Sequence, residues 1–122
     1  HWGGLMVYIA LGEFIDLEPA GWLRIGSLDF PDARVGDVHV GPDRYDVELG
    51  AGVRVRRNGE LFLESPSRVI VRLPLTPGGD VLVVARGPGQ IDLVDARWAD
   101  RPAVVNGTPA GRMDGGRLRW EA

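Results

Sequence analysis

Apolar and polar residues follow two different patterns along this chain of 122 residues. The segment WGGLMVYIALGEFIDL, residues 2–17, carries apolar side chains on nearly every side when it is wound as a helix. At about 1.5 Å per residue it predicts a helix of about four turns. Pro19 cannot continue a helix and pushes Glu18 towards extended geometry, so we expect this terminal helix to cover residues 1–18.

After Gly21 the pattern changes to alternation with period two, interrupted by recurring Gly, Pro, Asn and Asp. Such alternation is typical of short strands joined by turns. Because no helical segment is interleaved, we expect a mainly β domain over residues 19–122, folded as an antiparallel β-sandwich of about ten short strands. The expected strands cover residues 22–28, 35–40, 44–49, 53–56, 60–64, 68–75, 81–86, 90–94, 97–105 and 117–120.

The apolar content of individual segments predicts their places in the sheets. RVIVRLPL (residues 68–75) and VLVVAR (residues 81–86) are apolar at both alternating positions, which indicates central strands. RYDVEL (residues 44–49) alternates cleanly and should keep one face wet. Asn106-Gly107 predicts a hairpin, and Pro109 places the strand that follows at a sheet edge.

A second Asn-Gly pair, Asn58-Gly59, lies between VRVR and ELFLE. A two-residue type I′ turn would split the apolar side chains of these strands between two faces. A three-residue loop over residues 57–59, with Gly59 in a left-handed bulge, unites them on one face and pairs Arg56 with Glu60. We therefore predict the bulged hairpin. The side chains expected on its core face are those of Val53, Val55, Leu61 and Leu63.

Composition excludes several kinds of chemistry. All 14 basic residues are arginines, so there is no lysine for a P-loop, a Schiff base or a general base. There is no Cys, which excludes a thiol nucleophile, a thiolate zinc site and a disulfide framework. The net charge of −3 disfavours nucleic acid and anionic membranes as partners. No targeting or membrane-spanning segment is visible, so we expect a soluble, cytoplasmic protein.

Candidate catalytic residues do not form a known arrangement. His39 lies between Val38 and Val40 on an expected strand and should point away from the core, while the serines lack a G-x-S-x-G context. Most of the five aspartates of the first half at Asp29, Asp32, Asp37, Asp43 and Asp46 adjoin Gly or Pro in expected turns, and no D-x-D-x-D-G spacing is present. We expect no catalytic residue, metal site or cofactor within this chain. A catalytic Asp/Glu pair remains the least favoured alternative.

The arginine cluster and the tryptophans allow both structural and binding interpretations. Arg54, Arg56 and Arg57 alternate with valines, which favours a solvated strand face over a ligand site. The four tryptophans are best explained as core residues. Trp22 and Trp98 are the candidates for a carbohydrate-stacking surface, and Trp98 is the one expected to be most exposed.

Residues His1 to Leu5 (HWGGL), the following apolar segment with Glu13, then DLEP (residues 16–19) and GWLRIGSL (residues 21–28) resemble the C-terminal part of glycoside-hydrolase-like proteins. The type is an (α/α)6 toroid, as in mannosylglycerate-hydrolase-like and processing-glucosidase-like enzymes. The resemblance covers about the first quarter of the chain. It implies that the terminal helix is the last helix of a toroid and that the strand-rich part is its β-sandwich tail.

In this family the catalytic Asp and Glu lie before the last helix, so the resemblance implies that both are upstream of His1. Only His1 and Trp2 match a region that could line a sugar subsite. The start at His1 without an initiator Met suggests a fragment of a longer protein. We therefore expect a non-catalytic C-terminal domain of a carbohydrate-active enzyme, whose partner is the upstream helical catalytic domain. A carbohydrate-binding module is the alternative, and the isolated fragment could form a homodimer.

Overall fold

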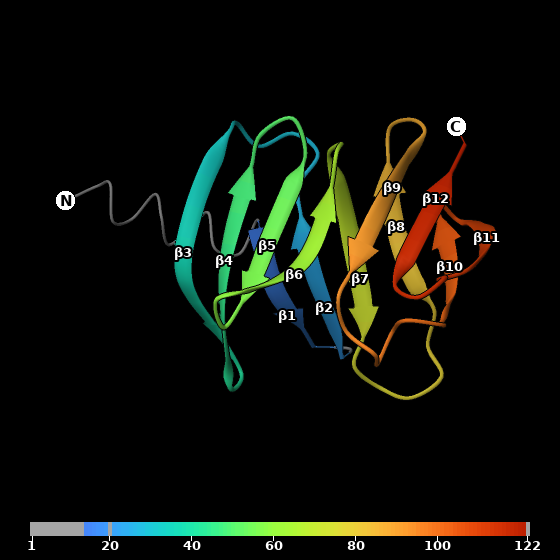
Figure 1. Cartoon of the computed structure of the whole chain (residues 1–122), viewed down its shortest axis with the longest axis horizontal. Helices are drawn as coiled ribbons and strands as arrows, with labels where there is room; N and C mark the ends of the chain where they lie inside the picture. The colour runs from blue at the N-terminus through green and yellow to red at the C-terminus, as the bar shows by residue number, and fades with distance from the viewer. Residues whose placement is uncertain (1–13, 20, 122) are drawn as a thin grey trace.

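The computed structural model describes residues 14–19 and 21–121, which are mainly β, as the sequence predicts. Twelve strands form two six-stranded sheets that stack on each other (Figure 1). In spatial order, sheet A contains β1 (Ile15–Glu18), β2 (Trp22–Gly26), β7 (Val69–Pro74), β8 (Val81–Ala85), β10 (Pro102–Val105) and β11 (Thr108–Arg112). Sheet B contains β12 (Arg117–Trp120), β9 (Gly89–Leu93), β6 (Glu60–Ser65), β5 (Val53–Arg57), β4 (Asp43–Leu49) and β3 (Ala33–Val40).

One hydrophobic core lies between the sheets and is built by alternate residues of both. The most deeply buried side chains come from the middle of each sheet, where strand alternation directs apolar residues inward. β7 and β8 are central strands of sheet A, which confirms the interpretation of residues 68–75 and 81–86. β4 alternates between buried and more exposed residues, as RYDVEL predicts. Fully buried core residues include Ile25, Val55, Leu63, Val69, Val71, Leu73, Val81 and Ile91.

The expected terminal helix does not extend to residue 18, because residues 15–18 are a strand; its residues 1–13 lie outside the described part, and the helix there stays a prediction. Residues 15–18 form β1, which pairs antiparallel with β2. Ile15 is opposite Ile25 in the core, and Asp16 is opposite Arg24 on the outer face. The turn that follows is closed by a 3.0 Å hydrogen bond from the Gly21 N–H to the Glu18 carbonyl. The proline at position 19 therefore ends a strand of the sandwich, and the sandwich begins before residue 19.

The hairpin between β5 and β6 has a different geometry from the predicted one. Arg57 pairs with Glu60 around a two-residue loop, and the loop residues Asn58 and Gly59 have φ values of 53° and 85°, as a type I′ turn requires. The bulge lies inside β6 instead of in the loop, because Arg56 pairs with Leu61 and Val55 with Leu63. The residue between them is the extra one and turns into the core.

This displaced bulge explains how an Asn-Gly turn is compatible with a continuous core. Phe62 and Leu63 are both buried, whereas Leu61 is 37% exposed. The prediction that Val53, Val55 and Leu63 share the core face is confirmed, but the place given to Leu61 is wrong. A bulge shifts the alternation by one residue, so apolar neighbours in sequence can both face inward.

The sheets are not wholly antiparallel, because β10 pairs parallel with β8. The chain leaves β8 in sheet A, forms β9 in sheet B and returns to sheet A beside β8 (Figure 1). Residues 96–100 of this return form turns, so the expected strand over residues 97–105 is limited to β10. The Asn106-Gly107 hairpin and the edge position of Pro109 on β11 are confirmed.

Candidate functional surfaces

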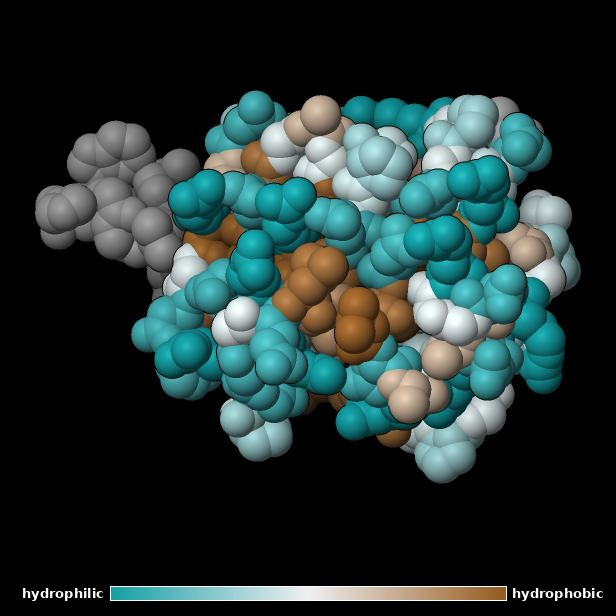
Figure 2. All heavy atoms as spheres, in the orientation of Figure 1, coloured by the Kyte–Doolittle hydropathy of each residue, from teal (hydrophilic) through white to brown (hydrophobic). Residues whose placement is uncertain are grey.

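The outer face of sheet B carries a row of charged side chains that crosses all six strands. Strand register places one charged residue of each strand in line with the next. Arg54 Nε lies 2.8 Å from a Glu64 carboxylate oxygen, and Arg117 Nε lies 2.7 Å from an oxygen of Asp92. Figure 2 shows this face as mostly hydrophilic, with an apolar cluster near its middle. From β3 to β12 the charged row comprises Arg34, Glu48, Arg54, Glu64, Asp92 and Arg117.

Opposite charges are neighbours at most positions of this row. A hydrogen bond from Arg34, followed by its charge, lowers the pKa of Glu48. The only like-charged junction in the row is between Glu64 and Asp92, which are directly opposite. Among the described residues no three His, Cys, Asp or Glu side chains form a group that could hold a metal ion. Surface ion pairs of this kind contribute little to stability, so the main effect of the charged row is to keep this face hydrated.

The outer face of sheet A has the opposite character at its β8 and β10 end. Neither strand contains a charged residue, and their outward side chains are Leu82, Val84, Pro102 and Val104. Register brings these side chains together with Ile70 of β7, because Ile70 is opposite Val84 and Leu82 is beside Val104. Val84 is 40% exposed. We call Ile70, Leu82, Val84, Pro102 and Val104 the apolar face. Val84 and Pro102 are its exposed members, the other three are partly buried, and Arg72 lies beside Leu82 at its margin.

A groove of about 470 Å³ lies where the edge strands β11 and β12 diverge. Ala85, Val105 and Trp120, at 9%, 8% and 7%, are the most exposed members of the core, and Val105 and Trp120 line the groove. Its rim is polar and includes Thr108, Arg119 and Glu121. The sandwich is therefore open at this edge, with an apolar floor and a polar rim.

A smaller pocket of about 230 Å³ lies between the sheets beside β1 and β4. Tyr45 lines this pocket, and burial raises the pKa of its hydroxyl group. The charge of Asp43 also raises this pKa, whereas Arg57 lowers it. Arg57 is held by Asp95 at 2.8 Å and lies over the Phe62 ring, with its guanidinium carbon 4.3 Å from the centroid. The pocket is smaller than the usual range of about 300–1,000 Å³ for small-molecule sites, and of its two arginines Arg57 is paired with Asp95 while Arg97 lies over the Trp98 ring.

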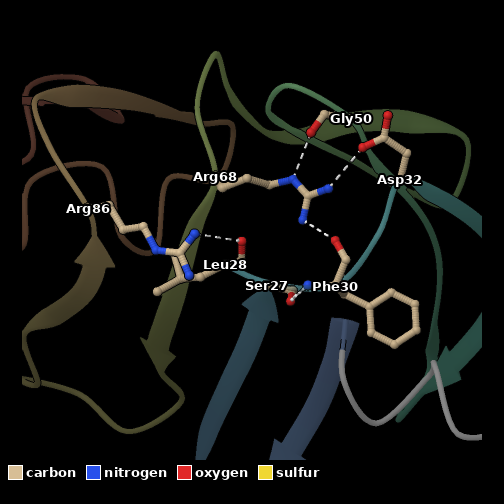
Figure 3. Close-up of polar contacts among 7 residues, drawn as sticks. All are labelled: Ser27, Leu28, Phe30, Asp32, Gly50, Arg68 and Arg86. Atoms are coloured by element: carbon tan, nitrogen blue, oxygen red, sulfur yellow. Dashed lines mark hydrogen bonds and ion pairs between the residues drawn. The ribbon is translucent and has the colours of Figure 1, made fainter.

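Arg68 forms the most completely bonded polar centre (Figure 3). Its Nε donates to the Gly50 carbonyl at 2.7 Å, and its terminal nitrogens donate to the Phe30 carbonyl at 2.7 Å and to Asp32 at 3.2 Å. Arg86 approaches the same loop through the Leu28 carbonyl. Because its three nitrogens are all engaged by loops that connect strands, Arg68 has a structural role and is not free to bind a ligand.

The two tryptophans proposed for carbohydrate stacking do not share a surface. Trp98 is 1% exposed, so the prediction that it is the most exposed tryptophan is wrong. Its indole N–H donates to the Pro74 carbonyl at 2.7 Å, which fixes the ring inside the core. Trp22 is half-buried on the outer face of sheet A, opposite Pro74. The other proposed substrate-lining residues, His1 and Trp2, lie outside the described residues.

Of the other sequence-based predictions, some are confirmed and one is wrong. His39 is exposed, as predicted, and its Nε2 lies 3.3 Å from an Asp37 oxygen. Arg54 and Arg56 are on the solvated face, but Arg57 is partly buried and pairs with Asp95. Residues 86–90 connect β8 to β9 without forming a phosphate-binding helix turn.

Sequence reasoning missed the apolar face and the groove. The signal for the apolar face is present in VLVVAR, whose outward positions are as apolar as its inward ones. The pattern was interpreted only as a buried strand, because alternation alone does not say what covers the second face. The groove has no local signal, since its walls come from the connection that follows β8, the β10–β11 hairpin and β12.

Within the described part of the chain, no helix is long and apolar enough to cross a membrane. Comparison with family models, with curated proteins and with solved structures gives no match in any of the three.

Proposed function

We propose that this chain is a non-catalytic β-sandwich domain of a longer carbohydrate-active enzyme of the glycoside-hydrolase type. In this proposal the apolar face packs against an upstream helical catalytic domain of the same protein. The family assignment rests on the sequence resemblance in the first quarter of the chain. The packing role rests on the contrast between the outer faces of the two sheets.

The contrast between the outer faces is the observation that carries the proposal. Every strand of sheet B presents at least one charged residue outward, which suits a face in contact with water. β8 and β10 present none, and their outward residues are aliphatic or proline. Burying such a surface contributes about 25 cal/mol per Å² of apolar area removed from water. The other strands of sheet A present charged residues outward, among them Arg24, Arg72 and Arg112, so the proposed packing surface is confined to the β8 and β10 end of the sheet.

A helical neighbour fits the apolar face better than another sheet edge. The side chains of the apolar face come from adjacent central strands, whose backbone hydrogen bonds are already made within sheet A. Side-chain packing is then the available mode of contact, and helices commonly cover sheet faces in this way. The alternative of a carbohydrate-binding module that uses Trp22 and Trp98 has less support, because Trp98 is buried.

The first test is the coding sequence upstream of His1. The proposal expects a few hundred residues of helical pattern, with a Glu about a dozen positions before His1. Their absence would contradict it. The second test co-expresses that upstream segment with this chain as separate polypeptides and measures co-purification.

The matched variants for co-purification are Val84→Asp and Val94→Asp. Both residues are exposed valines, at 40% and 57%, but only Val84 belongs to the apolar face. We expect Val84→Asp to abolish co-purification and Val94→Asp to leave it unchanged. Equal effects of the two variants would contradict the proposed packing.

A further inference from the structure

β12 forms one edge of sheet B, and half of its backbone groups point away from the sheet (Figure 1). The Gly116 carbonyl accepts the Leu93 N–H at 2.7 Å, and in an antiparallel ladder every second residue bonds to the same neighbouring strand. The backbone groups of Trp120 therefore point to β9, and those of Arg119 point outward to the open edge.

These outward backbone groups are closed at the start of β12 and open at its end. The Arg117 N–H donates to the Asp114 carbonyl at 3.1 Å, and the Arg117 carbonyl accepts the Asp114 N–H at 2.8 Å. No strand of the described chain lies beside Arg119, so its N–H and C=O groups have no ladder partner there. The groove of about 470 Å³ adjoins Arg119, and Val105 and Trp120 remain slightly exposed in it. This edge can therefore accept one more strand, which would cover the open part of the core.

The other three edges of the described sheets carry features that impede strand pairing. β11 contains Pro109, which has no N–H group, and β1 presents two like charges outward, Asp16 and Glu18. β3 is interrupted by a bulge at which Asp37 has a φ of 60°. β12 has neither a proline nor a bulge, and its register with β9 is continuous. Of the four edges, β12 is the one suited to pairing.

The exposed side chains at the open end of β12 carry complementary charges. Arg119 donates one hydrogen bond to Gln90 at 3.2 Å and forms no ion pair with a described residue. Glu121, on the same side by alternation, has no ion pair or side-chain hydrogen bond within the described part of the chain. Both point to the outer face of sheet B, away from the buried Trp120 side chain. One positive and one negative charge, neither paired within the described chain, thus flank Trp120 in the sequence.

We propose that β12 pairs antiparallel with β12 of a second copy of this chain, about a twofold axis beside Trp120. In this register Arg119 of each copy is opposite Glu121 of the other, so opposite charges meet twice on the outer face. The backbone groups of both residues point outward, as a hydrogen-bonded antiparallel pair requires. The added strand covers the groove of each copy. A twofold contact of this kind uses the same surface on both partners.

Other pairings of this edge fit less well. An axis beside Arg119 places two arginines directly opposite each other, and an axis beside Glu121 does the same with two carboxylates, which is destabilising. A shift by one residue would turn the inner side chains of one strand towards solvent. A strand of another protein would need an acid opposite Arg119 and a base opposite Glu121. A second copy supplies both.

The test is analytical ultracentrifugation of the chain at low salt, between about 10 μM and 1 mM. We expect a reversible equilibrium between monomer and dimer. Arg119→Glu and Glu121→Arg should each weaken self-association by about tenfold or more, because like charges then face each other twice. An equimolar mixture of these two variants should form a mixed dimer, since both pairs of opposite charges are restored. The matched control is Arg117→Glu on the same strand and face, which should leave self-association nearly unchanged because the Arg117 backbone is bonded to Asp114.

Amide hydrogen exchange tests the backbone pairing separately. The Arg119 N–H should exchange rapidly in dilute solution and about tenfold or more slowly where the dimer forms, whereas the Trp120 N–H should be protected in both conditions. Circular dichroism of each variant establishes that it is folded.

Three results would overturn the proposal. A chain that is still a monomer at about 1 mM would leave this edge to a strand from another source. Equal dimerisation of all variants, or no mixed dimer from Arg119→Glu and Glu121→Arg, would exclude the proposed register. Loss of the dimer in Val84→Asp would assign the contact to the apolar face instead. We expect the dimer to survive Val84→Asp, because β12 is an edge of sheet B and the apolar face is on the outer side of sheet A.

Discussion

Trp98 donates its indole N–H to the carbonyl oxygen of Pro74 at 2.7 Å and packs edge-to-face against Phe62, with ring centroids 6.1 Å apart. The first contact reaches the end of β7 in sheet A, and the second reaches β6 in sheet B. The connection between β9 and β10 is thereby fixed across the end of the sandwich. Trp98 therefore joins the two sheets and completes the core.

Replacing Trp98 tests this joining role. Trp98→Phe loses the hydrogen bond and leaves the Pro74 carbonyl without its partner, which we expect to cost about 1–3 kcal/mol in free energy of unfolding. Trp98→Ala should cost about 3–5 kcal/mol because it also leaves a large cavity. Urea unfolding measures both. The control is Trp22→Phe on the outer face of sheet A, and a larger loss there than for Trp98→Phe would contradict this account.

The Arg57–Asp95 ion pair predicts a specific dependence of stability on pH. Burial tends to raise the pKa of Asp95, but the hydrogen bonds from Arg57 and from the Arg97 N–H, together with their charges, lower it below 3.8 overall. A carboxylate with a lowered folded-state pKa stabilises the fold above its unfolded-state pKa, and this contribution is lost as the pH falls through the folded-state value.

We therefore expect Asp95→Asn to lower the free energy of unfolding by about 1–3 kcal/mol at pH 7, with the difference from wild type shrinking below about pH 4. Thermal unfolding from pH 7 to pH 2.5 measures this difference. Asp100→Asn, an exposed change in the same connection, should be within about 0.5 kcal/mol of wild type. A difference for Asp95→Asn that grows towards low pH would refute the assignment.

Asn106 links the β10–β11 hairpin to β8. Its Oδ1 accepts the Ala85 N–H and its Nδ2 donates to the Ala85 carbonyl, both at 2.9 Å. Its φ of 51° is in the left-handed region. Asn106→Ala loses both bonds and strains the turn, so we expect a loss of about 1–3 kcal/mol. Asn106→Gly should lose about 1 kcal/mol less, because glycine tolerates this φ. Equal unfolding midpoints for wild type and Asn106→Ala would contradict this role.

The charged row of sheet B predicts weak effects that depend on salt. Arg54→Gln removes the 2.8 Å pair with Glu64, and because both side chains are exposed we expect a loss of no more than about 1 kcal/mol. The loss should diminish between about 0.01 M and 1 M salt as screening increases. Arg56→Gln, on the same strand, is the control because Arg56 forms no ion pair with a described residue. A loss for Arg54→Gln that is independent of salt would be inconsistent with this view.

The sequence predicts the mainly β class and most of the strands because alternation and turn residues are local signals. The β5–β6 hairpin shows what such local signals cannot predict. Asn58-Gly59 correctly indicates a two-residue turn, but that turn is compatible with the core only because Phe62 is an extra residue in β6. Nothing in ELFLE says which residue is the bulge. Its place is decided by packing against the other sheet.

Contacts between distant segments account for the other differences. β1 exists because residues 15–18 find a partner in β2, whereas an apolar run alone is equally typical of a helix. Trp98 lies in a turn between Arg97 and Ala99, and its burial depends on the end of β7 being within reach of its indole N–H. The groove and the apolar face depend on how strands are ordered in the sheets. Residue patterns within one strand do not contain that order.

The most direct test of the central claim is hydroxyl-radical footprinting of this chain joined to the upstream catalytic domain that the proposal expects, compared with the isolated chain. Mass spectrometry would measure side-chain oxidation of Leu82 and Val84 on the apolar face, with Leu61 and Val94, both exposed, as internal controls. We predict that oxidation of Leu82 and Val84 falls severalfold in the longer protein while that of Leu61 and Val94 is unchanged. Unchanged oxidation of Leu82 and Val84 would contradict the proposed packing of this face.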